Sequence, residues 1–217
     1  MKSSTWKTLN TLTGGLSAPS KMPSHGWSIS ATTCAMGAIL RKVAGSTCSG
    51  CYALKGRYMF ANVQDALARR LEAWKSSPVE WIGAMIGSIL KTRNNVFRWF
   101  DSGDIQGPEM LSDIATVATG TDGVRHWLPT RERARVKAWL RDGNRIPDNL
   151  NIRVSAPMID GRLPQPIEGC TMSTVISSED KLPEGAVMCR AYTQGNECKD
   201  CRACWDKSVP IVTYLVH

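Results

Sequence analysis

Residues 96–120 read VFRWFDSGDIQGPEMLSDIATVATG, a short aromatic run followed by a polar turn and an amphipathic segment. The run over 96–101 has the β-branched and aromatic composition that is typical of a strand. Gly107 and Pro108 then open a segment whose apolar residues recur at helical spacing. This stretch therefore predicts a strand, a turn and a helix in direct succession.

The same alternation continues in both directions along the chain. Upstream, apolar residues at helical spacing predict helices over 62–74 and 77–90. Downstream, a strand over 124–128, a helix over 130–140 and a strand over 150–155 follow one another. Strands that alternate with helices in this way indicate βαβ units and a parallel sheet. The predicted fold class is α/β, either a partial βα barrel or an open parallel sheet.

Composition divides the chain into three parts. Residues 1–30 are rich in Ser, Thr, Gly and Pro and predict an irregular N-terminal segment, and residues 31–165 hold the predicted βα core. Residues 166–217 are dense in proline, glycine and cysteine and predict a Cys-rich, loop-dominated C-terminal extension. One domain with an appendage agrees with a length of 217 residues.

The overall composition excludes some classes of protein. A hydrophobic content of 42% with 21% charged residues is typical of a globular chain. No apolar run approaches the ~18 residues of a membrane span, and Met1–Gly15 contains no apolar core of a secretory signal. We therefore expect a cytoplasmic protein without a membrane partner. Eight cysteines in a reducing compartment predict metal or redox chemistry.

Charge is distributed unevenly. Residues 1–165 contain 22 Lys+Arg and 12 Asp+Glu, a net of +10, whereas residues 166–217 contain 5 and 7, a net of −2. A basic body favours nucleic acid or another anionic ligand as a partner. Ordinary surface charge is the alternative explanation.

Four cysteines near the C-terminus follow the pattern Cys189-x8-Cys198-x2-Cys201-x2-Cys204. Four thiolates at such spacing suit tetrahedral zinc or an iron–sulfur cluster. The continuous CxxCxxC run favours a [4Fe–4S] cluster, because zinc sites usually pair two separated CxxC turns. Zinc is the alternative at this group.

A second set, Cys34, Cys48 and Cys51, offers three thiolates. Three ligands would leave one iron of a four-iron cluster, or one position on a zinc ion, open to a substrate or cofactor. Two alternatives stay open: Cys170 completes the set and closes it, or Cys34 takes no part.

Polar or small residues follow each predicted strand of the core. Because ligands gather at the carboxyl ends of parallel strands, these residues are candidates for a binding site. Capping loops of purely structural importance are the alternative. The candidates are Ser102, Gly103 and Asp104 after the first strand, Thr130 and Arg131 after the second, and Ser155 after the third.

Several of these motifs together resemble the bacteriophage gene product eighty-eight family. The resemblance extends from about Cys34 to the C-terminus and places the protein in the cytoplasm of a host cell. The segments that carry it are Cys48–Tyr58, FRWFDSGDI at 97–105, HWLPTRER at 126–133, IRVSAP at 152–157 and CRACW at 201–205.

The segment CSGCYA at 48–53 is more distantly similar to the cluster motif of radical S-adenosylmethionine (SAM) enzymes. That resemblance implies a [4Fe–4S] cluster on Cys34, Cys48 and Cys51 with SAM bound at its open iron. It also implies that the strand-end candidates bind the cofactor. Those enzymes space their cysteines as C-x3-C-x2-C, whereas thirteen residues separate Cys34 from Cys48 here.

Two functions follow from these patterns. The first is an iron–sulfur protein with a radical-SAM-like core, one or two [4Fe–4S] clusters and SAM as a further cofactor. The alternative is a basic nucleic-acid-binding module that zinc or an iron–sulfur cluster holds together, without catalysis. Metal analysis and salt-dependent binding assays distinguish the two.

Overall fold

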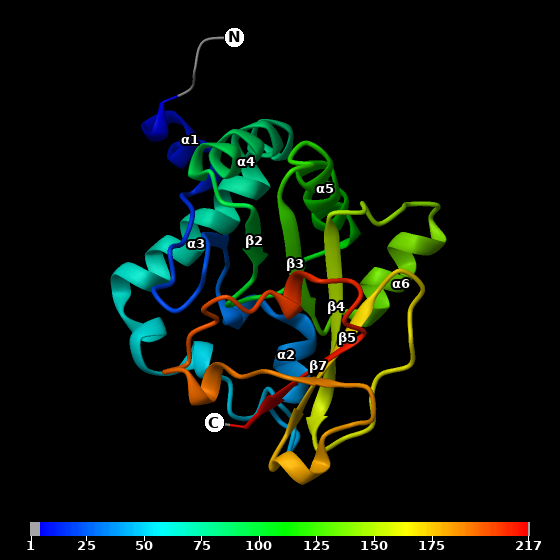
Figure 1. The fold of residues 1–217 in the computed structure, drawn as a ribbon. Helices are drawn as coiled ribbons and strands as arrows, with labels where there is room; N and C mark the ends of the chain where they lie inside the picture. The colour runs from blue at the N-terminus through cyan, green and yellow to red at the C-terminus, as the bar shows by residue number, and fades with distance from the viewer. Residues whose placement is uncertain (1–4, 217) are drawn as a thin grey trace.

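A computed structural model describes residues 5–216 (Figure 1). The helices are α1 (Trp6–Thr13), α2 (Ala35–Leu40), α3 (Ala61–Ser76), α4 (Pro78–Thr92), α5 (Pro108–Thr119) and α6 (Arg133–Arg141). The strands are β1 (Gly26–Trp27), β2 (Val96–Trp99), β3 (Arg125–Thr130), β4 (Leu150–Ile159), β5 (Thr171–Ile176), β6 (Val187–Met188) and β7 (Ile211–Leu215). Short 3₁₀ turns lie between them, including η1 (Ala31–Thr33), η2 (Tyr52–Leu54), η3 (Gly56–Met59) and η6 (Ala203–Trp205).

The seven strands form one parallel sheet in the order β1-β2-β3-β4-β5-β7-β6. The first five strands are added in chain order, so right-handed crossovers place their connecting helices on the same face. The sheet does not close on itself. The predicted α/β class is therefore confirmed in its open-sheet form.

The helix-covered face of the sheet holds the larger apolar core. Trp27, Trp81 and Trp99 are fully buried there, with ring centroids 5.2–6.2 Å apart. Alternate residues of β4, such as Ile152 and Val154, point into the same core. This alternation follows from the period of two along a strand. The helices α4 and α5 contribute their apolar stripes to this layer.

The opposite face of the sheet carries Arg98, Trp127, Asn151 and Arg153, and we call it the polar face. The C-terminal chain covers it: Trp205 packs on Trp127 with ring centroids 5.2 Å apart, and its indole N–H donates to the Phe97 carbonyl at 2.8 Å. Figure 1 shows this orange-to-red chain crossing in front of the strands.

Two terminal regions differ from the sequence predictions. The N-terminal segment predicted as irregular contains α1, capped by the Thr5 side chain, and β1, which pairs with β2. The predicted loop-dominated extension beyond residue 165 instead supplies β5, β6 and β7 to the main sheet. These strands escaped prediction because β1 and β6 span two residues each, and β5 reads TMSTVI, with little apolar alternation.

Candidate functional site

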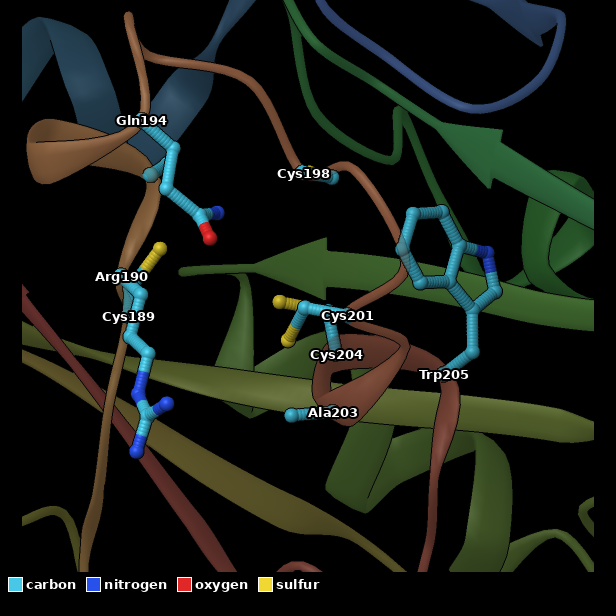
Figure 2. A pocket seen from close by; sticks show the side chains of 9 residues that line it. Cys189, Arg190, Gln194, Cys198, Cys201, Ala203, Cys204 and Trp205 are labelled. Carbon is cyan, nitrogen blue, oxygen red and sulfur yellow. The ribbon is translucent and has the colours of Figure 1, made fainter.

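The four C-terminal cysteines line one pocket on the polar face, together with Arg190, Gln194 and Trp205 (Figure 2). The thiols of Cys189, Cys201 and Cys204 point toward the shared hollow, whereas the Arg190 guanidinium turns away from it.

Backbone hydrogen bonds fix the chain around this pocket. The N–H of Cys189 donates to the Thr213 carbonyl of β7 at 2.8 Å, and the N–H of Cys198 donates to the Lys21 carbonyl at 3.3 Å. The N–H of Cys201 donates to the Cys198 carbonyl at 2.9 Å, which closes the CxxC turn. The fold thus brings together four cysteines that the sequence grouped.

Burial governs the ionisation of these thiols. It raises the pKa of Cys204 to about 12, and it raises the pKa values of Cys189 and Cys198. Cys189 and Cys198 also raise the pKa of Cys204, which shows that the thiols lie near one another. These shifts favour the neutral S–H form of Cys189, Cys198 and Cys204, so a metal would have to displace those protons.

Arg153 is fully buried beside this pocket and fastens the cysteine-rich chain to the sheet. Its Nη1 donates to the Met172 carbonyl at 2.7 Å. Its Nη2 contacts three carbonyls of the covering chain, those of Ala203 at 3.1 Å, Val209 at 3.2 Å and Asp206 at 3.4 Å. Each of these acceptors is a neutral carbonyl.

Arg98 brings a second guanidinium to the polar face. Its Cζ lies 4.5 Å from the ring centroid of Trp127, and its Nη1 donates to the Met22 sulfur at 3.5 Å. The same sulfur accepts from the Cys198 thiol at 4.0 Å. Met22 therefore links Arg98 to Cys198, which lines the cysteine pocket.

Neither guanidinium has a carboxylate partner. Among residues 5–216, the ion pairs join Arg135 to Glu132 and Lys181 to Asp160. The Nε atoms of Arg98 and Arg153 and the indole N–H of Trp127 are also buried without an acceptor in the described part of the chain. Carboxylates act on both groups from beyond ion-pair distance: Asp101 contributes to the raised pKa of Arg98, and Asp206 opposes the lowering of the pKa of Arg153 by burial. The positive charge of the polar face is therefore offset in part, while its three buried donors have no acceptor among the described residues.

The four cysteines are of the residue type that binds soft metals. Four thiolates are the ligands of structural zinc and of iron–sulfur clusters, and either complex carries net negative charge. Across the described residues, no group of three or more His, Cys, Asp or Glu side chains stands as a preformed metal site.

The first cysteine group lies at the carboxyl end of the sheet. Cys34 is the N-cap residue of α2, and Cys48 and Cys51 precede η2. The turn that carries Cys48 is held against the end of β4, because the Thr47 N–H donates to the Pro157 carbonyl at 2.9 Å. The helix α2 and the turns after it make up the thirteen residues that separate Cys34 from Cys48.

The three thiols of this group influence one another. Burial, together with Asp104, Cys51 and Cys48, raises the pKa of Cys34 to about 12. Burial also raises the pKa of Cys48, while the nearby Arg131 guanidinium lowers it. Unlike the C-terminal group, this group has a carboxylate close by.

Cys170 belongs to neither group. It packs against the apolar core, and burial raises its pKa to about 12 with Lys207 as the opposing charge. It does not line the C-terminal pocket, and it is not among the groups that shift the pKa of Cys34.

Asp104 joins the ends of two strands. Its Oδ1 accepts from Thr130 Oγ1 at 2.6 Å and from the Ile105 N–H at 2.8 Å, and its Oδ2 accepts from the Arg131 N–H at 2.8 Å. Burial raises its pKa to about 6 against the opposing effect of these hydrogen bonds. Asp104 thus connects the segment after β2 to the end of β3 through Thr130 and Arg131. The Arg131 Nε also donates to the Thr47 hydroxyl at 2.9 Å.

The remaining strand-end candidates take different places. Gly103 has φ +85°, and a Cβ there would lie 2.4 Å from Ile29 Cγ1, so close packing requires glycine. The Ser102 hydroxyl is buried and has no partner among the described residues. Ser155, on the polar face, accepts from the Ser173 hydroxyl at 3.0 Å.

Sequence reasoning missed the two arginines of the polar face, of which Arg153 is buried and Arg98 half-buried. Arg98 stands inside an aromatic run and Arg153 inside an aliphatic one, at positions where alternation turns the side chain away from the helix-covered core. A charged residue in a buried strand was the available signal that the second face of the sheet is polar.

In the described part of the chain, no helix is long and apolar enough to cross a membrane.

Comparison with known proteins gives one match. A protein-family model described as gene product 88 matches residues 2–207, which is nearly the whole chain. Neither the curated proteins nor the solved structures gave a match.

Proposed function

The chain belongs to the gene product 88 family, and from this premise we propose that it is an iron–sulfur protein with a cluster on the polar face. Cys189, Cys198, Cys201 and Cys204 are the proposed ligands. The observation that supports this proposal is the pairing of four pocket-lining thiols with two guanidinium groups that have no carboxylate partner among the described residues.

The energetic argument concerns buried charge. Removing an ion from water costs several kcal/mol unless an opposite charge compensates it. Arginine cannot escape this cost by losing its proton, because its pKa lies above ~12. A thiolate-ligated cluster beside Arg98 and Arg153 would supply the missing negative charge, and zinc would supply it in the same way.

The residues around the pocket then have separate tasks. Arg153 holds the covering chain in place through the Ala203, Asp206 and Val209 carbonyls. Trp205, which is 3% exposed, keeps water from one side of the pocket. The Tyr214 hydroxyl lies 3.2 Å from the Cys204 sulfur and can donate a hydrogen bond to its thiolate form. A bound cluster would supply one-electron chemistry.

The proposal extends to a second, open cluster at the first cysteine group. Cys34, Cys48 and Cys51 lie near one another at the carboxyl ends of the strands, where parallel sheets bind ligands. Three thiolates leave one iron available, and SAM is the proposed occupant, as in radical SAM enzymes. The unpartnered Ser102 hydroxyl is a candidate contact. Asp104 and Thr130 would act by holding the strand ends rather than by touching SAM.

Metal analysis tests this proposal. We expect iron and acid-labile sulfide in matching amounts in protein purified without oxygen: about eight irons per chain for two clusters, or about four for one. Cys198→Ala should remove the C-terminal share and Cys48→Ala the other, whereas Cys170→Ala serves as the matched control. Zinc without iron would overturn the iron–sulfur proposal.

A separate assay tests the SAM part. The iron-loaded protein, incubated anaerobically with SAM and dithionite, should release 5′-deoxyadenosine, and Cys51→Ala should abolish the release. Full iron content without that product would overturn SAM cleavage and leave the iron–sulfur assignment intact.

A further inference from the structure

Positive charge is concentrated in one part of the chain. Residues 1–64 contain seven Lys+Arg and no Asp or Glu. Four of these cations, Arg41, Lys42, Lys55 and Arg57, lie in the segment 39–60 that surrounds the first cysteine group, and all four are exposed. None of the four side chains makes an ion pair or a hydrogen bond within residues 5–216.

The same segment exposes large aromatic side chains. Tyr52 is 59% exposed and Phe60 58%, although most other aromatic residues of the protein are buried. Contiguous exposed apolar surface in a basic setting marks an interaction site more often than a random feature. We call Arg41, Lys42, Tyr52, Lys55, Arg57 and Phe60 the basic rim.

The elements that carry the basic rim are packed in sequence against one another. The turn η1 contacts both α2 and η2, and η2 contacts η3. The isolated bridge between Ser46 and Met158 fastens the intervening loop to the end of β4. The cations and rings therefore belong to segments that are packed against one another.

Hydrogen bonds hold the aromatic part in position. The Tyr52 hydroxyl donates to the Asp101 carbonyl, and the Tyr58 hydroxyl donates to the Asp101 carboxylate at 2.8 Å. The two tyrosine rings meet edge to face with centroids 5.7 Å apart. The Tyr52 ring thus stays exposed and ordered, which lowers the entropic cost of binding a partner.

We propose that the basic rim binds single-stranded nucleic acid, with phosphates on the four cations and unpaired bases stacked on Tyr52 and Phe60. Flat exposed rings beside unpaired cations are the combination that single-stranded nucleic acids require. In a duplex the base faces are already stacked and cannot use the rings. An anionic membrane would engage basic and apolar groups through a long amphipathic helix, whereas α2 has 6 residues.

The test is fluorescence anisotropy with a labelled single-stranded oligonucleotide on the full chain, over a series of salt concentrations. With four phosphate contacts, log K should fall with log salt at a slope of about −2.8. The double variant Lys55→Gln/Arg57→Gln should halve that slope to about −1.4. Tyr52→Leu and Phe60→Leu should each weaken binding about tenfold by removing a stacking surface.

Matched controls make the result decisive. Lys137→Gln/Arg141→Gln removes the same charge from the exposed surface of α6 and should leave binding within about twofold. Tyr52→Phe keeps the ring but lacks the hydroxyl that donates to Asp101, so it should lose much less binding than Tyr52→Leu, which separates stacking from loss of fold. Binding is also measured to a duplex of the same sequence, to an RNA strand and to anionic phosphatidylserine vesicles.

Several outcomes would overturn the proposal. They are no binding of single strands at low salt, equal binding of duplex, an equal loss in the α6 control, or binding of vesicles but not of oligonucleotide. This inference does not depend on the proposed cluster, because the variants lie outside the cysteine ligands and iron content is measured on the same samples.

Discussion

The two faces of the sheet treat buried polar groups in opposite ways. On the helix-covered face, His126 is 0% exposed and burial lowers its pKa to about 3, so it is neutral. Trp99 donates to its Nδ1 at 3.2 Å, and its Nε2 faces the Thr121 hydroxyl at 2.8 Å. On the polar face, Arg98 and Arg153 stay charged and have no carboxylate partner among the described residues.

The contrast shows where an external charge is needed. A histidine can give up its proton and satisfy both ring nitrogens with internal partners, so His126 needs no external charge. A guanidinium cannot be neutralised in this way. Under the proposed function, a metal centre ligated by the four cysteines would supply negative charge to the polar face.

We expect the largest effect on metal content and stability from replacing one cysteine on each side of the sheet. Burial raises the pKa of both Cys204 and Cys170 to about 12. Cys204→Ala should release the metal of the C-terminal group and lower the free energy of unfolding by about 3–5 kcal/mol, because the arginines lose their counter-charge. Cys170→Ala should retain all metal and cost about 1–2 kcal/mol for the small cavity.

Urea unfolding and metal analysis of the two variants measure this difference. Equal losses of stability with unchanged metal content in both variants would contradict the contrast between the faces. Loss of metal in Cys170→Ala but not in Cys204→Ala would show that the metal lies on the helix-covered side instead.

The next effect concerns His126 and pH. Because its pKa falls from 6.5 in the unfolded chain to about 3 in the fold, the unfolded state binds the extra proton first on acidification. The stabilisation is present above pH 6.5 and is lost as pH falls toward 3. Between pH 7 and pH 5 the wild type should lose about 2 kcal/mol more than His126→Gln. Unfolding titrations at the two pH values measure this, and parallel losses in both proteins would show that His126 is not neutral in the fold.

The helix-covered half of the fold was predictable because local and tertiary signals agree there. Apolar residues at helical spacing in α3, α4 and α5, and aromatic runs in β2 and β3, all point to the same core. The strands β1 and β6 are too short for any periodic pattern, and β5 alternates between two faces that are both partly polar. The sheet therefore extends into a region whose composition is typical of loops.

The grouping of the C-terminal cysteines was predictable, but the surroundings of their pocket were not. Cysteine spacing grouped Cys189, Cys198, Cys201 and Cys204, and the structure lines one pocket with them. Spacing carries no information on the strand positions that face the pocket, so Arg98 and Arg153 were not foreseen. The role of Asp104 was also hidden, because its three donors come from backbone and side-chain positions that only the folded strand ends bring together.

The smallest expected effect isolates the counter-charge of Arg98. Arg98→Met keeps the apolar contact with Trp127 but removes the positive charge near Cys198. Metal retention at the C-terminal group should weaken about tenfold, which corresponds to ~1.4 kcal/mol, and Arg98→Lys should recover most of it. Arg125→Met removes an exposed charge from the neighbouring strand, where solvent screens it, and should change retention by less than about twofold. Competition with a chelator measures retention in all three variants. If Arg98→Met held metal as tightly as the wild type, the Arg98 guanidinium would not be a partner of the proposed metal centre, and the contrast between the two faces would rest on Arg153 alone.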